Sequence, residues 1–303
     1  MPRHRPRPVR DACEAAALLG VLALLRSLPF GFALEAGGCL GALVGRLDRR
    51  HLALAEAQMS EALGAGFDGR TGARAVYRHL GMCLAELAWL PRRARRPADM
   101  TAWVRIEGME HVQAALARGR GLAIVSGHLG NWELAAAAMA SAGIPLSLVA
   151  RPLDNLRLDA VLTSIRMAGG SEVISKRNAL RAVREVLARG RGLAILIDQD
   201  AREHGVFVPF FGRPASTIPS IAAVCLRAEA PLVVTAMRRD PGGRTHTLTF
   251  EAVTPPPPSG DAKEDVRALT GLLTARLEAR IRKAPEQWLW MHRRWKTRAP
   301  TGS

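Results

Sequence analysis

The chain has 303 residues, 48% of them hydrophobic, which is enough apolar material for one large core and allows one or two domains. Its 43 Lys and Arg residues against 27 Asp and Glu residues give a formal net charge of +16, which favours a polyanionic partner: nucleic acid, anionic lipid headgroups or an acidic protein. The four cysteines are scattered and form no Cys-x-x-Cys pair, which excludes a disulfide framework and a cysteine zinc site.

The first 50 residues combine positive charge with apolar runs. Four arginines lie within residues 1–10, and apolar runs follow at 15–25 and 30–44. Neither run reaches the roughly 20 residues that a bilayer span requires, and no signal-peptide cleavage site follows them. We therefore expect residues 1–50 to be an uncleaved membrane anchor that lies in the interface or spans once, with the basic end in the cytoplasm. A helix packed on the rest of the protein is the alternative.

After the anchor, the apolar pattern changes from helical to that of an α/β fold. Apolar residues recur at helical spacing through residues 51–90, interrupted by a turn at 64–72. A basic run at 92–96, flanked by prolines, predicts an exposed connection. From Val104 onward, short apolar runs alternate with amphipathic segments, which is typical of an α/β sheet. We therefore predict one domain over residues 51–303.

Two segments far apart in the chain read almost alike. Residues 114–127 are AALARGRGLAIVSG and residues 185–198 are EVLARGRGLAILID. Each predicts a helix end, a glycine stop and a short strand buried on both faces. We interpret them as two αβ units of one sheet, with chance similarity as the alternative. His128 follows the first strand and Asp198 the second, and ligands bind beyond the carboxyl ends of such strands, so one site should contain both side chains.

His128 and Glu133 lie at a strand-to-helix junction. Asn131 stands where a helix cap belongs, and Glu133 falls in the first helical turn. On one helix, a spacing of five would separate two side chains by about 140°, so we place His128 in the preceding loop and expect Glu133 to fold back toward the imidazole. A carboxylate on one ring nitrogen makes the other a stronger general base. The alternative is a buried histidine beside a glutamate that complements the helix dipole.

Other kinds of site find less support. The sequence has no Gly-x-Gly-x-x-Gly or Walker-type loop, so no nucleotide cofactor is predicted, and no Gly-x-Ser-x-Gly elbow to supply a nucleophilic serine. A metal-dependent hydrolase would need a second histidine at ligand spacing, and His204 is the one nearby candidate, so no metal is predicted. A basic nucleic-acid-binding protein would explain the charge but neither the anchor nor the His-Glu spacing, so no nucleic-acid partner is predicted.

The segment HLGNWE at residues 128–133 resembles the H-x4-D/E box of glycerolipid-type acyltransferases, in the Glu variant of the bacterial lipid A secondary (late) acyltransferase family. Further segments resemble that family in the same order: ARPLDN (150–155), Arg166, ILIDQD around Asp198, VPFFGRPAST (208–217) and PEQWLWMHRRWKTR (285–298). The resemblance covers nearly the whole chain. It implies an α/β fold with a mixed central sheet flanked by helices, preceded by an N-terminal hydrophobic membrane-anchoring helical segment.

The resemblance also implies roles for particular residues. His128 and Glu133 are expected to form the catalytic dyad. Arg166 and Asp198 are expected to bind substrate, by holding the acceptor phosphate or the thioester and shaping the site. At the mouth of the pocket, two further substrate-binding residues are implied: Arg151 and Asn155.

The reaction implied is direct O-acyl transfer without an acyl-enzyme. His128 would deprotonate a hydroxyl of a lipid A precursor, which then attacks the thioester of acyl carrier protein. The oxyanion would be stabilised by backbone N–H groups at 127–130 or by Arg166, and no cofactor is implied. Alternative acceptors are a lysophospholipid, a glycolipid or a phosphatidylinositol mannoside. Acyl chain length would depend on the depth of a hydrophobic pocket.

An acidic carrier protein and an anionic membrane surface both suit the basic charge. The cations expected to contact one or the other are the run at 92–96 and four residues of the tail: Arg293, Arg294, Lys296 and Arg298. Trp288, Trp290 and Trp295 suit a membrane interface, with core packing as the alternative. The resemblance places the protein at the cytoplasmic face of the inner membrane, peripheral or with a single N-terminal span.

Overall fold

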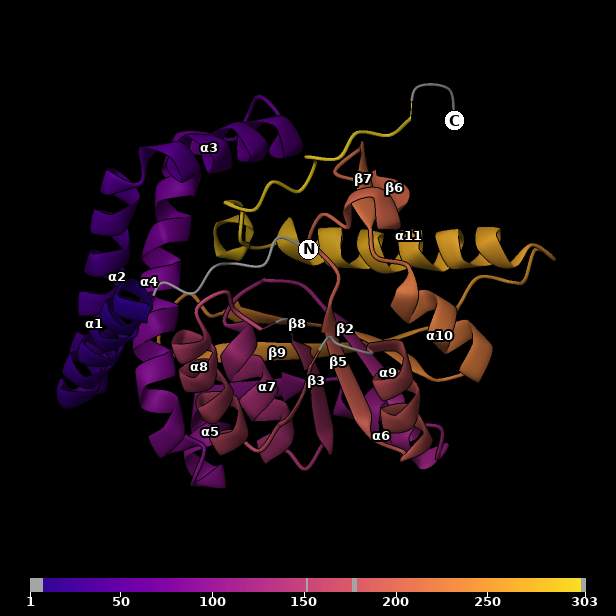
Figure 1. The fold of residues 1–303 in the computed structure, drawn as a ribbon, viewed down its shortest axis with the longest axis horizontal. Coiled ribbons are helices and arrows are strands. Elements are labelled where there is room, and N and C mark those ends of the chain that lie inside the picture. Colours follow the sequence, from indigo (N-terminus) through magenta and orange to yellow (C-terminus); the bar gives the residue numbers. More distant parts are fainter. Residues whose placement is uncertain (1–7, 151, 176–178, 301–303) are drawn as a thin grey trace.

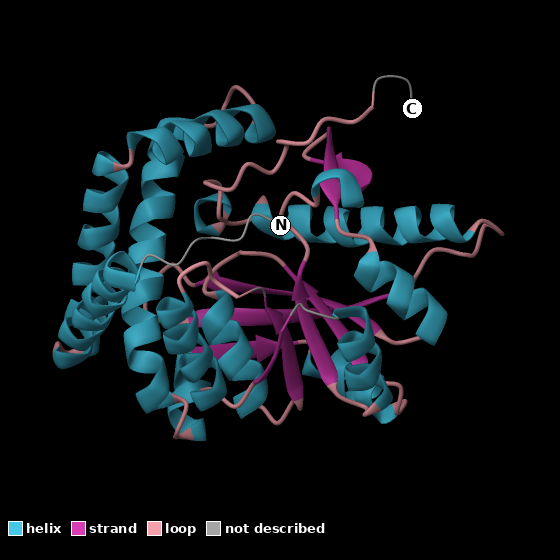
Figure 2. Ribbon diagram, in the orientation of Figure 1, coloured by secondary structure: helices cyan, strands magenta, loops and turns pink. Residues whose placement is uncertain are grey.

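The computed structural model describes residues 8–150, 152–175 and 179–300. A central β-sheet lies between helical layers, and a group of long N-terminal helices stands at one side of it (Figures 1 and 2). This arrangement is the α/β class predicted from the alternation of apolar runs and amphipathic segments.

The N-terminal helices pack together around α4, the longest of them (Figure 1). Their bounds are α1 Pro8–Ser27, α2 Phe30–Leu47, α3 Arg49–Leu63 and α4 Gly69–Arg93. Asp48 and Asp68 cap α3 and α4 because their carboxylates accept backbone N–H groups of the first turn. The predicted turn at 64–72 is found at 64–68, between α3 and α4.

Glycines allow α2 to approach α4 closely. A Cβ on Gly37 would lie 2.4 Å from the carbonyl oxygen of Gly81, and one on Gly41 would lie 2.1 Å from that of Tyr77, so larger residues would force the helices apart. The helix α2 is long and apolar enough to cross a membrane, with 33% of it buried in the protein. One face of the N-terminal segment therefore packs on the rest of the chain, as in the alternative interpretation of the sequence.

The central sheet has seven strands in the order β1-β9-β8-β2-β5-β3-β4. The five strands from β8 to β4 are parallel, β9 is antiparallel to β8, and β1 is parallel to β9, so the sheet is mixed as predicted. The strand bounds are β1 Val104–Glu107, β2 Leu122–Ser126, β3 Leu146–Ala150, β4 Glu172–Ser175, β5 Gly192–Leu196, β8 Leu232–Arg239 and β9 His246–Val253.

The two similar segments form neighbouring parallel strands, β2 and β5. Ile124 pairs with Ala194 and Ser126 with Leu196, so the two strands end at the same edge of the sheet. The first four residues of β2 are fully buried, as expected for a strand covered on both faces. The interpretation as two αβ units of one sheet is confirmed, and His128 and Asp198 follow the strands at this edge.

Helices cover both faces of the sheet, and each layer buries its own apolar core. With α4, one face is covered by α5 Pro97–Trp103, α6 Met109–Ala117, α7 Trp132–Ser141 and α8 Leu156–Ala168. The other face is covered by α9 Ala179–Ala188, α10 Ser220–Ala228 and α11 Ala262–Ile281. Between β5 and α10 lie the 3-10 turn η1 Arg202–His204 and an antiparallel hairpin of β6 Val206–Phe210 and β7 Arg213–Thr217.

The C-terminal tail begins with the 3-10 turn η2 (Pro285–Gln287) and returns to the sheet edge, where Leu129 and Trp288 form an isolated β-bridge. Trp288 and Trp290 are 1% and 0% exposed, and Trp295 stacks on Phe210 with ring centroids 5.7 Å apart. Placing these tryptophans at a membrane interface was wrong for Trp288 and Trp290, because they fill the core between the tail and the β6–β7 hairpin.

The expectation that Arg294 contacts an acidic carrier protein or an anionic membrane was wrong, because its side chain is 0% exposed. Its guanidinium donates to the carbonyl of Ser216 at 2.5 Å and to the Thr217 hydroxyl, which fixes the tail against β7. Arg294 is therefore not available to a partner, whereas three other tail cations remain exposed: Arg293, Lys296 and Arg298.

Candidate active site

The side chains that follow β2 and β5 are in direct contact. The Nδ1 of His128 lies 2.8 Å from Oδ1 of Asp198, and the backbone N–H of His128 donates to Oδ2 at 2.6 Å. The indole N–H of Trp288 donates to the same Oδ2 at 2.7 Å. Asp198 is 4% exposed. Both of its oxygens therefore have partners within the protein, and its position is fixed by three hydrogen bonds.

This arrangement sets the tautomer of His128. An ionised carboxylate only accepts hydrogen bonds, so the proton of the neutral imidazole must be on Nδ1. The lone pair is then on Nε2, which has no hydrogen-bond partner among the described residues. The imidazole is 16% exposed and meets the Trp132 ring edge-to-face at a centroid distance of 5.0 Å. A histidine held in this way can take a proton at Nε2.

The charges around His128 favour its protonated form. Burial lowers the pKa of an imidazole, but the negative charge and hydrogen bond of Asp198 outweigh it, with a smaller contribution from Glu133, so the pKa of His128 is raised above its ordinary 6.5. Burial works against ionisation of Asp198 too, yet the charge and hydrogen bonds of His128 hold the pKa of Asp198 at about 2. The base is thus strengthened by a partner that stays ionised.

Glu133, in the first turn of α7, has a different partner from the one predicted. Its carboxylate receives two hydrogen bonds from the Arg166 guanidinium of α8, at 2.8 Å from Nε and 2.6 Å from Nη2. The two side chains are 11% and 16% exposed, so this bidentate pair is well shielded from water. The predicted bond between Glu133 and the imidazole is wrong, because both Glu133 oxygens are bound to Arg166 and the carboxylate at Nδ1 is that of Asp198.

An apolar cavity adjoins this ion pair. It lies between α7, α8 and the strands of the central sheet, with Glu133, Arg166 and Trp132 at its polar border. The rest of the wall comes from one face of α7, the ends of β3 and β5, and two hydroxyl-bearing residues of β2 and β8: Ala135, Ala136, Met139, Leu148, Val149, Ala150, Ala194, Ile195, Leu196, Ser126 and Thr235. The ion pair thus borders the cavity directly, and the His128 imidazole adjoins it through Trp132, whose ring it meets edge-to-face.

The sequence profile of the bacterial lipid A biosynthesis acyltransferases matches residues 9–297, nearly the whole chain. The chain belongs to this family. The lipid A biosynthesis palmitoleoyltransferase of Escherichia coli (strain K12) is 32% identical over 232 residues, which cover 75% of this chain and 71% of the relative. The lauroyltransferase of the same organism is 29% identical over 295 residues, 92% of this chain and 90% of the relative. A phosphatidylinositol mannoside acyltransferase of Mycobacterium tuberculosis is 26% identical over 194 residues, covering 63% and 59%.

In this acyltransferase, the expected substrate-binding residues take different positions. Asp198 is buried, and both of its oxygens are bound to His128 and Trp288, so neither oxygen faces the cavity as a free substrate contact. Asn155 does not border the cavity: it is 8% exposed, caps α8 and donates to the Asp11 carbonyl of α1 at 3.0 Å. Arg166 borders the cavity as expected. Arg151 lies outside the described residues.

The backbone of the catalytic loop is also more fully engaged than expected for an oxyanion hole. The N–H of His128 donates to Asp198, that of Leu129 to the Gly127 carbonyl at 2.8 Å, and that of Gly130 to the Gln287 carbonyl at 2.9 Å. These N–H groups are therefore not free to bind an oxyanion in this state. Arg166 is the expected oxyanion donor that still borders the cavity.

Trp288 contributes to the site of this acyltransferase in a way that was not predicted. The basic, aromatic tail suggested a lipid interface for Trp288, yet its indole N–H donates to the carboxylate that binds His128. The signal available was the pattern WLW, in which two tryptophans separated by one residue share a face of an extended segment. That pattern indicates packing, but it does not tell which side chain the indole reaches.

Proposed function

We propose that this protein transfers a fatty acyl chain from the thioester of acyl carrier protein to a hydroxyl of a lipid A precursor, with His128 as the general base. The observation that carries the proposal is the free Nε2 of His128, which is opposite the Asp198-bound Nδ1. The same imidazole meets the ring of Trp132, a residue of the cavity wall, at a centroid distance of 5.0 Å. Family membership gives the reaction class and the type of acceptor.

The proposed reaction follows from which atoms of the site can accept a proton. His128 Nε2 takes the proton of the acceptor hydroxyl, and the oxygen attacks the thioester carbonyl carbon. The tetrahedral intermediate collapses as the carbon–sulfur bond breaks, and the thiolate of the carrier takes the proton from the imidazolium. Asp198 stabilises the imidazolium during the reaction without being protonated itself. Atoms and charge balance without a cofactor.

In this proposal, Glu133 and Arg166 act as one unit. Glu133 holds the guanidinium by two hydrogen bonds and adds negative charge near the imidazole. The guanidinium supplies the positive charge that a developing oxyanion requires. Glu133 is thus catalytic through Arg166 and through the field at His128, and not by bonding the imidazole.

The apolar cavity suits the acyl chain of the donor. Its walls come from small and aliphatic side chains of α7, β3 and β5, and its polar border is the Glu133–Arg166 pair. A thioester placed at this border would direct its hydrocarbon chain between helix and sheet. The exposed cations of the tail suit the acidic carrier protein that delivers the chain.

We place the protein at the cytoplasmic face of the inner membrane, with α1 and α2 lying in the interface. Large apolar side chains are exposed on these two helices: Leu19, Leu24, Phe32, Leu43, Val44 and Leu47. The opposite face of α2 carries the glycines that contact α4. A helix that is apolar on one face and packed on protein by the other suits an interfacial position better than an isolated span.

The proposal is tested with detergent-purified protein, a mixture of acyl carrier protein thioesters, and a Kdo-bearing lipid A precursor. Mass spectrometry of the lipid would show an added acyl chain and its length. We expect transfer by the native protein, loss of transfer in His128→Ala and Glu133→Ala, and no change in His204→Ala, which removes an imidazole that is 85% exposed.

The choice of acceptors separates the alternatives. Transfer to a lysophospholipid, a glycolipid or a phosphatidylinositol mannoside, but not to the lipid A precursor, would keep the mechanism and replace the acceptor. Absence of transfer to every acceptor by folded native protein would reject the proposed reaction.

A further inference from the structure

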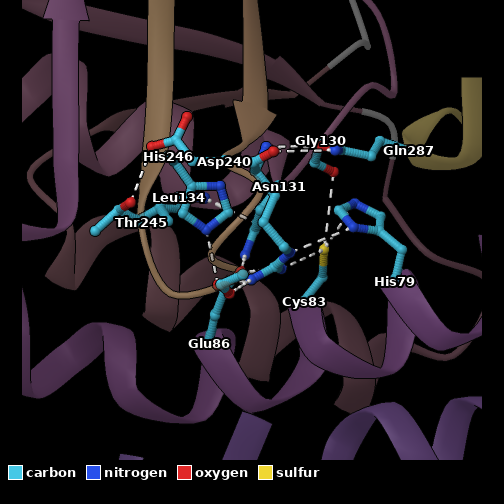
Figure 3. A network of polar contacts seen from close by, with 12 residues as sticks. His79, Cys83, Glu86, Gly130, Asn131, Leu134, Asp240, Thr245, His246 and Gln287 are labelled. Atoms are coloured by element: carbon cyan, nitrogen blue, oxygen red, sulfur yellow. Dashed lines mark hydrogen bonds and ion pairs between the residues drawn. The ribbon is translucent and has the colours of Figure 1, made fainter. Parts of the chain in front are cut away.

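A buried polar cluster lies next to the catalytic loop, between α4 and the β8–β9 hairpin (Figure 3). At its centre is the Glu86 carboxylate of α4, which is 0% exposed. The guanidinium of Arg239 donates to both carboxylate oxygens, and Nε2 of His246 lies 2.7 Å from Oε1. The Asn131 amide donates to Oε2 at 2.8 Å. Asn131 is therefore the point where this cluster reaches the catalytic loop.

Glu86 is charged in this environment. Burial opposes its ionisation, but the charges and hydrogen bonds of His246 and Arg239 outweigh burial and hold the pKa of Glu86 at about 2. A buried ion pair contributes little to stability compared with apolar side chains of similar volume. The cluster is therefore better explained by the geometry that it imposes than by stabilisation of the core.

Asn131 links the Glu86 cluster to the start of α7. Its Oδ1 accepts the backbone N–H of Leu134 at 3.1 Å, so the same amide group that binds Glu86 caps α7. Asn131 lies between His128 and Glu133 in the chain. Its orientation thus sets where the loop carrying the base passes into the helix carrying the ion pair.

The other side of the loop is held by the tail, through the same arginine. Gly130 donates its N–H to the Gln287 carbonyl at 2.9 Å. The Gln287 side chain in turn accepts the backbone N–H of Arg239 at 2.7 Å and donates to its carbonyl at 3.1 Å (Figure 3 shows Gln287 beside Gly130). Arg239 is therefore bound at its guanidinium by Glu86 and at its backbone by Gln287, so the loop is fixed from two directions.

We propose that Glu86 is a positioning residue of the active site, which orients the loop 128–133 by holding the Asn131 side chain. It touches neither substrate nor reacting atoms, so it acts on the spacing between His128 and the Glu133–Arg166 pair. Such a residue changes the turnover number and leaves substrate affinity nearly unchanged. The inference rests on the proposed function for its kinetic readout, but its structural readout is independent of the substrate.

The test is an exchange of the two polar partners. Asn131→Asp places a second carboxylate against Glu86 in a buried site, where two like charges do not coexist without rearrangement. Glu86→Gln removes the charge and keeps the shape. In the double variant Glu86→Gln/Asn131→Asp, the amide and the carboxylate change places, and one negative charge, the hydrogen bond between them and the cap on Leu134 are retained. Arg239 keeps one of its two hydrogen bonds to residue 86 and loses the other, because the Gln amide nitrogen is itself a donor.

We expect kcat to fall on the order of 10- to 100-fold in Asn131→Asp, as for a small misplacement of reacting groups, with KM within about twofold. The double variant should recover most of this loss. Amide hydrogen exchange of residues 128–134 should accelerate in Asn131→Asp and slow again in the double variant. Val112→Ala, on the buried face of α6, is the matched control for stability, and it should lower the unfolding temperature without changing exchange in the loop.

Two outcomes would overturn the inference. One is unchanged loop exchange in Asn131→Asp, which would show that the contact does not hold the loop. The other is a double variant no better than the worse single variant, which would show that the two residues do not act as a pair. If the native protein transfers no acyl chain, the proposed function fails, and the exchange measurements still decide whether Glu86 positions the loop.

Discussion

Two carboxylates lie near His128, and each has a different hydrogen-bond partner. Asp198 bonds Nδ1 and fixes the tautomer, while Glu133 bonds Arg166 and acts on the imidazole through its charge. Both carboxylates raise the pKa of His128, and the contribution of Asp198 is the larger. Replacing Asp198 should therefore move the pH dependence of transfer further than replacing Glu133.

Replacing Asp198 should change both the rate and its pH dependence. Asp198→Asn removes the charge that stabilises the imidazolium, so kcat should fall on the order of 10,000-fold. Transfer requires the neutral imidazole and therefore increases as pH rises through the pKa of His128. Without Asp198 this pKa is lower, so the acidic limb of the pH–rate profile should move to lower pH. An unmoved limb would mean that the base titrating in the profile is not His128.

Trp288→Phe is the control for that measurement. It removes one hydrogen bond to Asp198 but leaves the carboxylate and its charge in place. We expect a smaller loss of kcat, about tenfold, which corresponds to the free energy of one hydrogen bond to a charged group. The acidic limb of the pH–rate profile should stay close to that of the native protein.

The Glu133–Arg166 pair should behave as a unit in a double-mutant cycle. Glu133→Gln and Arg166→Gln each remove the bidentate contact, and each should reduce kcat strongly. If Glu133 acts mainly by holding the guanidinium, the double variant should be little worse than Arg166→Gln alone, because the interaction is already lost. Strictly additive losses in kcat would instead show that Glu133 acts independently of Arg166.

At the scale of elements, α7 carries residues of the candidate site at its start and part of the cavity wall along its length. Asn131 caps the helix, Glu133 lies in its first turn, and small side chains face the cavity on the following turns. The same helix therefore relates the position of the ion pair to the space in the cavity that we propose holds the acyl chain.

A large side chain on the cavity face of α7 should shorten the accepted acyl chain. Ala136→Phe fills space between α7 and the sheet, so kcat/KM should fall at least tenfold for the longest donor that the native protein uses, and less for shorter donors. Competition between acyl carrier protein thioesters, read by mass spectrometry, measures the shift. Ala114→Phe makes the same change on the exposed face of α6 and should leave chain preference unaltered. Equal losses for every chain length would argue against this cavity as the acyl site.

At the scale of the whole molecule, the helices α1 to α4 lie to one side of the α/β domain (Figure 1). The Glu86 cluster joins α4 to the β8–β9 hairpin and to the catalytic loop. The surface proposed to rest on the membrane and the loop that carries His128 are thus connected through one helix. If that surface binds lipid, the helix would hold the candidate site at a fixed position relative to it.

Removing exposed apolar side chains from that surface should weaken membrane binding without disabling the enzyme. Leu24 and Phe32 are 64% and 71% exposed, and each inserted side chain contributes on the order of 1–2 kcal/mol. Leu24→Ser/Phe32→Ser should therefore reduce binding to anionic vesicles at least tenfold, while transfer in detergent is retained. Met167→Ser removes a 62% exposed side chain at the end of α8 and serves as the control. Equal loss of vesicle binding in both variants would contradict the assignment of the surface to α1 and α2.

The sequence by itself determined the class of fold and the edge of the sheet where the site lies. The repeated helix end, Arg-Gly turn and buried strand are local signals, because apolar periodicity and glycine stops act within a few residues. They were sufficient to predict that β2 and β5 belong to one sheet and that His128 and Asp198 lie close together. The mixed sheet and the reaction class came from segments that resemble a family.

Only the tertiary structure decided which side chains bond to one another. Asp198, and not Glu133, reaches the imidazole because the register of β2 with β5 brings the two strand ends level, and Arg166 approaches Glu133 from a separate helix. The tail contains the residue types of a membrane interface, yet three of its side chains are buried against residues far away in the chain: Trp288, Trp290 and Arg294. Hydrogen-bond partners and burial depend on such long-range contacts, which residue type and local spacing do not determine.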